Sequence, residues 1–409
     1  MTDLTSKSVL TSKSVAGSSI PLPPDPGAAA PTPATEADVN GVAAPVNPRF
    51  AHSGEGYFSL VWRRFRRSFM GMLGLVLVGL LLIVAVFADF FAPMDPKAPH
   101  IGFAPPDQIS FTAPDGSFSL MPYVYPIRET GEFDPVTFQP LNGPDLENPT
   151  ELGFFVQGYP YTLFWVIPGN IHFFGAKDPT ETFHLLGTDK LGRDILSRGI
   201  IGSRISLTIA LVVVFLTTVI GTLVGITSGY KGGRFDAWVQ RFVEFVLAFP
   251  QLPLYLALTS LIPVTAPSNI FLAFVIAVMA ALGWAQLSRE VRSKTLSLAR
   301  IDYVRAAVAV GSSDMRIITR HILPNVLSHV IVAVTLAVPS VVLLESFLGF
   351  LGFAVKPPLI SWGLMLQDTG TFSVIGSYPW ILTPVAFVLI TVFAFNALGD
   401  GLRDAIDPY

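Results

Sequence analysis

The sequence predicts an all-α polytopic membrane protein, with six transmembrane helices and a small extracytoplasmic insertion of strands and loops. Hydrophobic residues make up 51% of the 409 residues and charged residues only 13%, whereas about a quarter of an ordinary soluble domain is charged. The apolar residues gather in runs long enough to cross a bilayer, and most short segments between them are basic. One long polar stretch, 93–204, follows the first run.

The first fifty or so residues are rich in Ser, Thr, Ala and Pro. Such a segment buries too little apolar surface to offset the entropy lost on ordering. We therefore expect 1–50 to be a disordered cytoplasmic tail. A cleavable signal peptide is not expected, because no apolar core follows the first lysines.

Residues 51–92 hold a basic lead-in, with Arg63, Arg64, Arg66 and Arg67, and the apolar run 69–91. At 1.5 Å per residue a run of this length crosses a hydrocarbon core of about 30 Å. Five further runs have the same character: 205–227, 242–262, 269–287, 326–344 and 378–398. Residues 205–398 are therefore expected to form a five-helix transmembrane core, and 399–409 a short C-terminus.

The segments between the runs carry lysines and arginines almost entirely on one side. That side has Arg63, Arg64, Arg66, Arg67, Lys231, Arg234, Arg241, Arg289, Arg292, Lys294, Arg300, Arg305, Arg316, Arg320 and Arg403. The other side has Lys356 alone, when the long 92–204 segment is excluded. Since short basic loops stay in the cytoplasm, both termini are expected there.

The insertion 93–204 contains extended runs bounded by Pro and Gly, such as 162–167 and 171–174, which predict short strands. Thirteen acidic residues stand against seven basic ones, and exposure is expected for the aromatics Tyr159, Tyr161, Phe164 and Trp165. Such a surface suits a protein partner of complementary charge. A solvated lid is the alternative.

A polar island interrupts the apolar core at 288–325. No helix breaker occurs in 303–310, and Gly311 supplies a helix stop. Ser312 or Ser313 is expected to cap a second helix that starts near Asp314 and ends before Pro324. The small side chains of the first helix, Ala306, Ala307 and Ala309, predict a ridge that another protein can approach closely.

This island resembles the cytoplasmic loop of the six-span membrane subunits of bacterial type I ABC importers. That loop carries Glu-Ala-Ala, three residues, Gly, nine residues and an aliphatic-Leu-Pro run. The corresponding residues here are Arg305, Ala306, Ala307, Gly311, Ile322, Leu323 and Pro324, with ten residues between Gly311 and Ile322. Arg305 replaces the acidic residue, so the charge is reversed there. The resemblance implies coupling to separate ATPases; an ordinary basic loop is the alternative.

Further stretches resemble the dipeptide and oligopeptide branch of that family, in its C-type permease with a long insertion. They are 184–198, 241–250, 345–363 and 399–408. In the first, Asp189 and Asp194 are expected to cap helix starts. In the third, Gly349 and Ala354 depart from the usual Ser and Gly of the family.

The third apolar run carries the candidate gating residues Glu244, Pro250 and Pro253. Proline bends a membrane helix, which suits a pathway that opens and closes. A water-facing ion pair between Glu244 and Arg241 is the alternative for the carboxylate.

The resemblance implies half of the translocation pathway of an ATP-driven importer of di- and oligopeptides in the bacterial inner membrane. Its expected partners are a second homologous permease subunit, two ATP-binding subunits and an extracytoplasmic substrate-binding protein. Nickel chelates and oligosaccharides remain open as substrates. A stand-alone secondary transporter is a further alternative, but it would carry ionisable residues in mid-span, where these runs have almost none.

Several kinds of chemistry are not expected. The sequence lacks the Gly-x-x-x-x-Gly-Lys-Ser/Thr phosphate loop, so the chain is not expected to bind ATP. Its six histidines are dispersed and it has no cysteine, which argues against a metal centre. No cofactor is expected, and a net charge of −3 with scattered basic residues does not suggest nucleic-acid binding.

Overall fold

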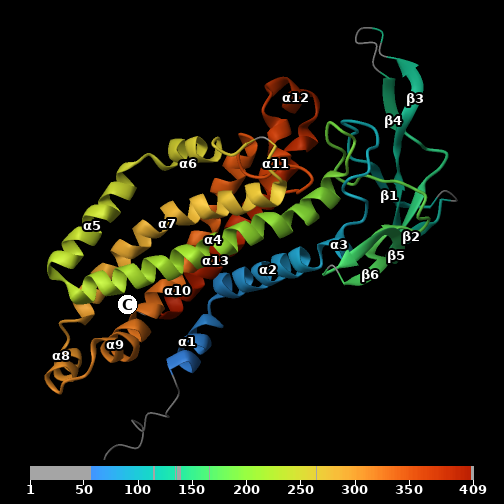
Figure 1. Ribbon diagram of the computed structural model, residues 1–409. Coiled ribbons are helices and arrows are strands. Elements are labelled where there is room, and N and C mark those ends of the chain that lie inside the picture. The colour runs from blue at the N-terminus through green and yellow to red at the C-terminus, as the bar shows by residue number, and fades with distance from the viewer. Residues whose placement is uncertain are drawn as a thin grey trace, which may run out of the picture. The chain divides into compact units, whose positions relative to one another are not determined.

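The computed structural model describes residues 57–406 except 114–115, 134, 136–139, 165 and 264. The expected tail 1–50 and Trp165 therefore lie outside the described residues. Helices dominate the described chain (Figure 1). The longer ones are α1 (Tyr57–Phe65), α2 (Phe69–Val86), α4 (Ile195–Lys231), α5 (Gly233–Ala248), α6 (Gln251–Thr259), α7 (Ser268–Leu298), α8 (Asp302–Ala309), α10 (Leu323–Phe350) and α13 (Thr383–Ile406). Short helices are α3 (Ala88–Phe91), α9 (Asp314–Ile317), α11 (Trp362–Leu366) and α12 (Phe372–Ser377).

Among the described residues, five helices are long and apolar enough to cross a membrane. They are Phe69–Val86, Ile195–Lys231, Ser268–Leu298, Asp314–Phe350 and Pro379–Ile406. The pair α5 and α6, bent by 80° at a short break, adds a sixth span when it is counted as one. The prediction of a polytopic helical protein is confirmed, and its six runs coincide with these six features.

Two helices extend well beyond the apolar runs that predicted them. Helix α4 begins at Ile195, where the carboxylate of Asp194 accepts the N–H of Ser197 at 2.7 Å. Helix α7 continues to Leu298, inside the predicted loop 288–325. Hydropathy marks the part of a helix that lies in lipid, whereas its ends are set by caps and by packing on neighbours.

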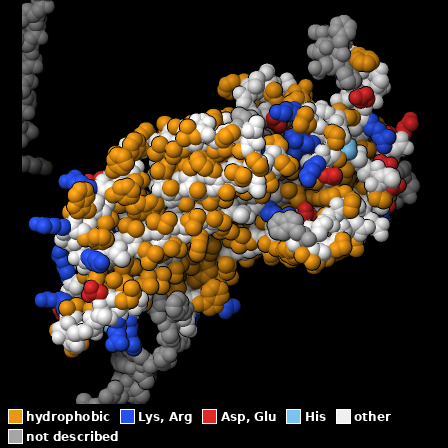
Figure 2. Space-filling view, in the orientation of Figure 1, with side chains coloured by type: hydrophobic (Ala, Val, Ile, Leu, Met, Phe, Trp, Pro, Cys, Tyr) orange, Lys and Arg blue, Asp and Glu red, His pale blue; other side chains and the backbone are white. Residues whose placement is uncertain are grey.

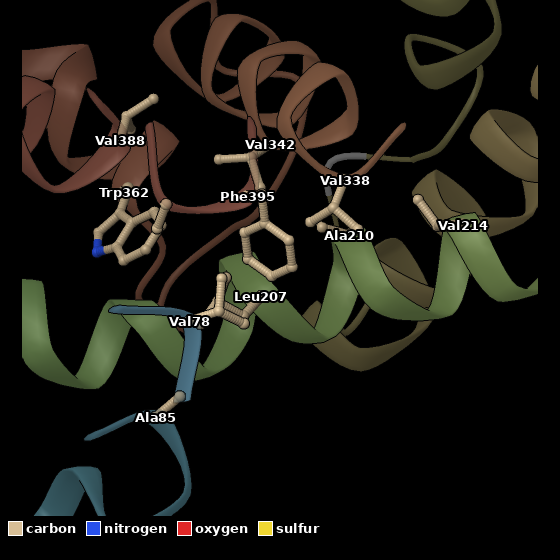
Figure 3. Packing of buried hydrophobic residues seen from close by; sticks show 11 residues of the cluster. Val78, Ala85, Leu207, Ala210, Val214, Val338, Val342, Trp362, Val388 and Phe395 are labelled. Carbon is tan, nitrogen blue, oxygen red and sulfur yellow. The ribbon is translucent and has the colours of Figure 1, made fainter. Parts of the chain in front are cut away.

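The core between the spans is built by side chains from α2, α4, α10 and α13. Figure 3 shows Val78, Leu207, Val342, Trp362 and Phe395 meeting in one buried cluster. The indole of Trp362 donates to the carbonyl of Gly199 at 2.8 Å. Because α11 brings this side chain into the cluster, the segment after α10 folds back onto α4.

The insertion forms a four-stranded antiparallel sheet in the order β1-β2-β5-β6 and a separate hairpin of β3 and β4. The strands are β1 (Gln108–Thr112), β2 (Phe118–Tyr125), β3 (Ile127–Phe133), β4 (Pro140–Pro144), β5 (Thr150–Leu163) and β6 (Ile167–Ala176). The prediction of strands is confirmed, but the run 162–167 is not one strand. A turn interrupts it at Phe164, whose φ is +52°.

Two of the aromatics expected to be exposed are partly buried instead. Tyr159 and Tyr161 both contact the ring of His172, at 4.4 and 5.1 Å between ring centroids. Burial raises the pKa of the Tyr159 hydroxyl. Phe164 is 49% exposed, as predicted. The pleat explains the error, since alternate side chains of a strand point to opposite faces.

A polar elbow joins the insertion to α4. The ring of His184 lies 3.2 Å from the carboxylate of Asp194, and the backbone N–H of His184 donates to Asp107. Burial raises the pKa of Asp107, despite two backbone hydrogen bonds that favour its charged form. Asp194 caps α4 as predicted. Asp189 caps no helix; its carboxylate accepts from Arg193 at 2.8 Å.

Candidate functional site

The polar island forms a helical corner between α7 and α10. Helix α8 ends at Ala309, and Gly311 follows with φ +79°. The N–H of Gly311 donates to Val308 at 3.0 Å and that of Ser312 donates to Ala307 at 3.1 Å. These two bonds satisfy carbonyls at the helix end, the pattern known as a Schellman motif. The predicted stop at Gly311 is confirmed.

For the second helix, the predicted start is confirmed and the predicted end is wrong. It begins at Asp314, but Ser313 at the cap position makes no side-chain capping bond. It does not stop before Pro324. A π-helical turn at Ile318–Ile322 leads into α10, so that the N–H of Leu323 donates to Ile318. Proline is tolerated next because it has no N–H to place and the wider turn gives its ring room.

One face of α8 is anchored to the spans. Val304 is 1% exposed, and Ala307 is half-buried against the same cluster. The buried members of this cluster come from α4, α7, α8, α9, the π turn and α10: Ile226, Val291, Val304, Ile317, Ile322, Val326 and Val330. The small residues Ala306 and Ala309 point away and are exposed, as is Arg305. Ala307 therefore does not belong to an exposed ridge, because helical periodicity puts it beside Val304.

The remaining members of the motif divide in the same way. Ile322 is fully buried and Leu323 packs against the cluster, whereas Pro324 is exposed. The exposed surface of this corner includes the apolar side chains of Tyr303, Val308, Val310 and Met315, together with the charged side chains of Asp302 and Arg305. We call Ala306, Ala309, Val308 and Val310 the α8 surface. Figure 2 shows Lys and Arg side chains gathered at the end of the molecule where α8 and α9 lie.

An ion pair that sequence inspection missed joins the beginning of α5 to α7. Arg292 Nε lies 2.6 Å from the carboxylate of Asp236, which also accepts from Ser228 of α4. The side chains of Arg292 and Asp236 are each at least two-thirds buried. Nothing in the sequence pairs residues this far apart, so the contact appears only in the fold. It connects the bent span to the last part of α7, which lies within the polar island.

The candidate gating residues lie on the bent span. Pro250 occupies the break between α5 and α6, and Pro253 lies in the first turn of α6, where its missing N–H costs nothing. Glu244 is exposed and its carboxylate lies 3.1 Å from Arg241. The structure thus contains the ion pair that was the alternative for Glu244.

A second buried polar group lies at the other end of the spans. Glu345 of α10 is fully buried, and Ser206 of α4 donates to its carboxylate at 3.0 Å. The same hydroxyl accepts the N–H of Trp362 at 3.1 Å. Three segments therefore meet at one hydroxyl. In the described part of the chain, no group of three or more His, Asp or Glu side chains has the geometry of a metal site.

Comparison with known proteins places these features in a family. Residues 221–409 match the family model of the binding-protein-dependent transport system inner membrane component. Residues 56–108 match the N-terminal TM domain of oligopeptide transport permease C. Between them lies the segment 109–220, which contains the six strands except for the first residue of β1, Gln108.

Relatives are similar over more than half of this chain. The oligopeptide transport system permease protein OppC of Haemophilus influenzae is 42% identical over 57% of this chain and 73% of that protein. OppC of Escherichia coli is 43% identical over 56% of this chain and 73% of that protein. The dipeptide transport system permease protein DppC of Bacillus subtilis is 37% identical over 56% of this chain and 70% of that protein. The chain belongs to the family of binding-protein-dependent transport system inner membrane components.

Proposed function

We propose that this permease forms half of the translocation pathway of an ATP-driven importer for di- and oligopeptides. The observation that carries the proposal is its likeness to three permeases named for oligopeptide or dipeptide transport, each covered over at least 70% of its length. A second homologous permease supplies the other half. An extracytoplasmic binding protein delivers the peptide, and two ATP-binding subunits supply the energy, so the chain itself is not an enzyme.

The α8 surface is the docking site for an ATP-binding subunit in this proposal. Its exposed side chains are small or apolar, with Asp302 and Arg305 exposed beside them, and Val304 of the same helix is held in a cluster shared by α4, α7 and α10. A movement of α8 is therefore transmitted to the ends of three spans at once. The tight packing of such a cluster resists continuous deformation, so displacement shifts whole helices.

The bent span carries the movement to the pathway. Arg292 of α7 and Asp236 of α5 are joined by two side-chain hydrogen bonds, so α5 follows α7. Further along α5, Arg241 and Glu244 are exposed as an ion pair. Exposed charges on a membrane helix face water or another subunit, because lipid does not solvate them. This side of α5 therefore lines the pathway between the two permeases.

In this proposal the permease spans the bacterial inner membrane, both termini and the α8 surface lie in the cytoplasm, and the insertion lies on the extracytoplasmic side. The asymmetry of basic residues supports this orientation. The chain has no cysteine, so single cysteines report the side directly. Ser312→Cys should react with a membrane-impermeant maleimide only after permeabilisation, and Ser373→Cys in intact cells. The reverse pattern contradicts the orientation.

Docking is tested by copurification with the ATP-binding subunits and by uptake of labelled di- and oligopeptides. Ala306→Glu and Ala309→Glu place a charge on the exposed face of α8 and should lower both readouts. Ser373→Glu, on the exposed surface of α12, is the matched control and should lower neither. Retention of both ATPase binding and uptake in the α8 variants contradicts the docking site. Uptake of nickel chelates or oligosaccharides instead of peptides contradicts only the substrate.

A further inference from the structure

The β5–β6 hairpin differs from the rest of the insertion in its lack of charge. Between Gly153 and Gly175 the sequence has no Asp, Glu, Lys or Arg. Its apolar side chains are nevertheless exposed: Phe155 by 67%, Val166 by 78% and Ile167 by 56%. Apolar side chains exposed at both ends of one hairpin are unusual on a domain surrounded by water and suit a contact with a protein or a membrane.

The hairpin lies against the end of the first span (Figure 1). The ring of Phe155 lies 6.2 Å from Phe90, and that of Phe173 lies 5.3 Å from Phe91. At the tip, Phe164 meets Phe87 edge to face at 5.8 Å. Helices α2 and α3 therefore hold the hairpin at the level where the first span leaves the hydrocarbon.

An open apolar cavity of about 240 Å³ lies between the hairpin tip and the spans. The residues that line it show which part of α4 the tip lies beside. Its lining combines Thr162 and Phe164 of the hairpin region with Leu82 of α2 and with Leu207 and Leu211 of α4. These α4 residues fall inside the apolar run 205–227, the part of the helix that crosses the membrane. The tip of the hairpin therefore lies beside the first residues of the hydrophobic segment of α4, and the cavity is open to the surroundings at this level.

Electrostatics restricts what can fill this cavity. Among the described residues that line the cavity, Arg204 is the one charged side chain, and one of its guanidinium nitrogens lies 2.8 Å from the carboxylate of Asp89. The same side chain donates to the carbonyl of Ala85 at 3.2 Å. Because its charge is already paired, the lining offers apolar contact and no strong attraction for an anionic group. Acyl chains meet this requirement.

The position of β6 limits how deep the hairpin goes. It is the last strand of the sheet, and β5 pairs with β2 only at Thr150 and Glu151. Among the described residues, the outer backbone N–H and C=O groups of both hairpin strands therefore have no neighbouring strand. Such groups are costly in hydrocarbon but are satisfied among hydrated headgroups. A hairpin that lies flat in the interface, with only its tip inserted, keeps the unpaired backbone groups among hydrated headgroups and places the apolar side chains in hydrocarbon.

We propose that the β5–β6 hairpin is an interfacial membrane anchor: its tip lies in the adjacent leaflet, and phospholipid acyl chains cover its apolar face and fill the cavity. The adjacent leaflet is the extracytoplasmic one in the orientation given above. The anchor does not depend on the transported substrate. It fixes the insertion at the membrane surface next to the first span, so that the charged strands and loops are held in the water above.

The absence of cysteine allows a direct test. Single variants Val166→Cys and Ile167→Cys at the tip carry a nitroxide label, and the full chain is reconstituted in vesicles of neutral phosphatidylcholine. Leu120→Cys on β2 is the matched control, since Leu120 is 84% exposed and also apolar. The measurement is the accessibility of the nitroxide to two paramagnetic reagents: oxygen, which concentrates in lipid, and a water-soluble nickel chelate. The tip labels should show a severalfold higher ratio of oxygen to nickel accessibility than the control.

Two outcomes would overturn the anchor. A ratio at the tip equal to that at Leu120 places the hairpin in water, and labels shielded from both reagents show that protein covers it. Val166→Asp provides a second test: the Ile167 label should become accessible to nickel, whereas Leu120→Asp should leave it unchanged. A label that stays in lipid beside the new charge contradicts the proposal. The vesicles contain this chain without partner subunits, so the accessibility measurements do not depend on peptide uptake. A failure of the proposed transport function would therefore leave the test of the anchor unaffected.

Discussion

A Cβ atom placed on Gly225 of α4 would lie 2.6 Å from the backbone carbonyl oxygen of Ser288 on α7. A Cβ atom placed on Gly221 or Gly229, one turn to either side, would lie 2.9 Å from the carbonyl oxygen of Trp284 or Arg292, respectively. Three glycines at four-residue spacing let the two backbones touch along one stripe. Membrane helices associate through such close packing, since lipid supplies little hydrophobic driving force between them.

Gly225→Val should therefore destabilise the permease. The new side chain meets backbone atoms, which cannot rotate away, so the helices must separate and lose contacts along the stripe. Overpacking of this kind costs about 1–3 kcal/mol. The measurement is the midpoint of thermal unfolding of the detergent-purified full chain. Gly79→Ala on α2 is the control, because its Cβ would have no neighbour within 4 Å; an equal loss in both variants contradicts the role of the stripe.

Breaking the ion pair between Asp236 and Arg292 should uncouple α5 from α7. Arg292→Gln leaves a carboxylate that is mostly shielded from water without its charged partner, at a cost of about 1.5–3 kcal/mol. We expect ATPase binding to survive and transport to fall, because the α8 surface is untouched. The control is Arg241→Gln, which breaks an exposed pair of a kind that contributes about 0–1 kcal/mol to stability.

ATPase binding and uptake are measured together in both variants. Equal uptake in Arg292→Gln and in the unaltered chain shows that α5 moves without this contact. A double variant, Asp236→Asn with Arg292→Gln, removes the unpaired charge. Partial recovery of stability without recovery of transport separates the structural from the coupling role of the pair.

The sequence predicted the part of the fold that depends on lipid. Six apolar runs coincide with the spans because twenty or so apolar residues have few other stable locations. It did not predict where helices end. The start of α4 at Ile195 and the extension of α7 to Leu298 depend on a cap and on packing against glycines of another helix. Those partners are far away in sequence and leave no local pattern.

The candidate site shows the same division. The stop at Gly311 was predictable, since the left-handed conformation it requires is a local property. The inward position of Ala307 was not, because small residues are compatible with both a docking face and close internal packing. The contact of Asp236 with Arg292 was invisible for another reason: the two residues are 56 positions apart, and no local pattern links them.

Gly349 departs from the Ser typical of the branch that the sequence resembles, and the structure gives a reason. A Cβ atom on Gly349 would lie 2.5 Å from the carbonyl carbon of Gly363. Gly349→Ser should push α11 away from α10 and lower the unfolding midpoint, at a cost of about 1–3 kcal/mol. Gly376→Ser on α12 is the control, because its Cβ would meet nothing within 4 Å. Unchanged stability in Gly349→Ser would show that α11 shifts freely.

The last prediction concerns Gly311, whose φ of +79° sets the corner after α8. A Cβ there would meet nothing within 4 Å, so any effect of substitution is conformational and not a clash. A β-branched residue adopts this conformation at a cost of about 1–2 kcal/mol, whereas Asn visits it more readily. Gly311→Val should therefore weaken ATPase binding and uptake more than Gly311→Asn, while membrane insertion, checked by maleimide labelling at Ser373→Cys, stays intact. Equal effects of Val and Asn would mean that side-chain bulk at the docked surface, and not the left-handed corner, matters at this position.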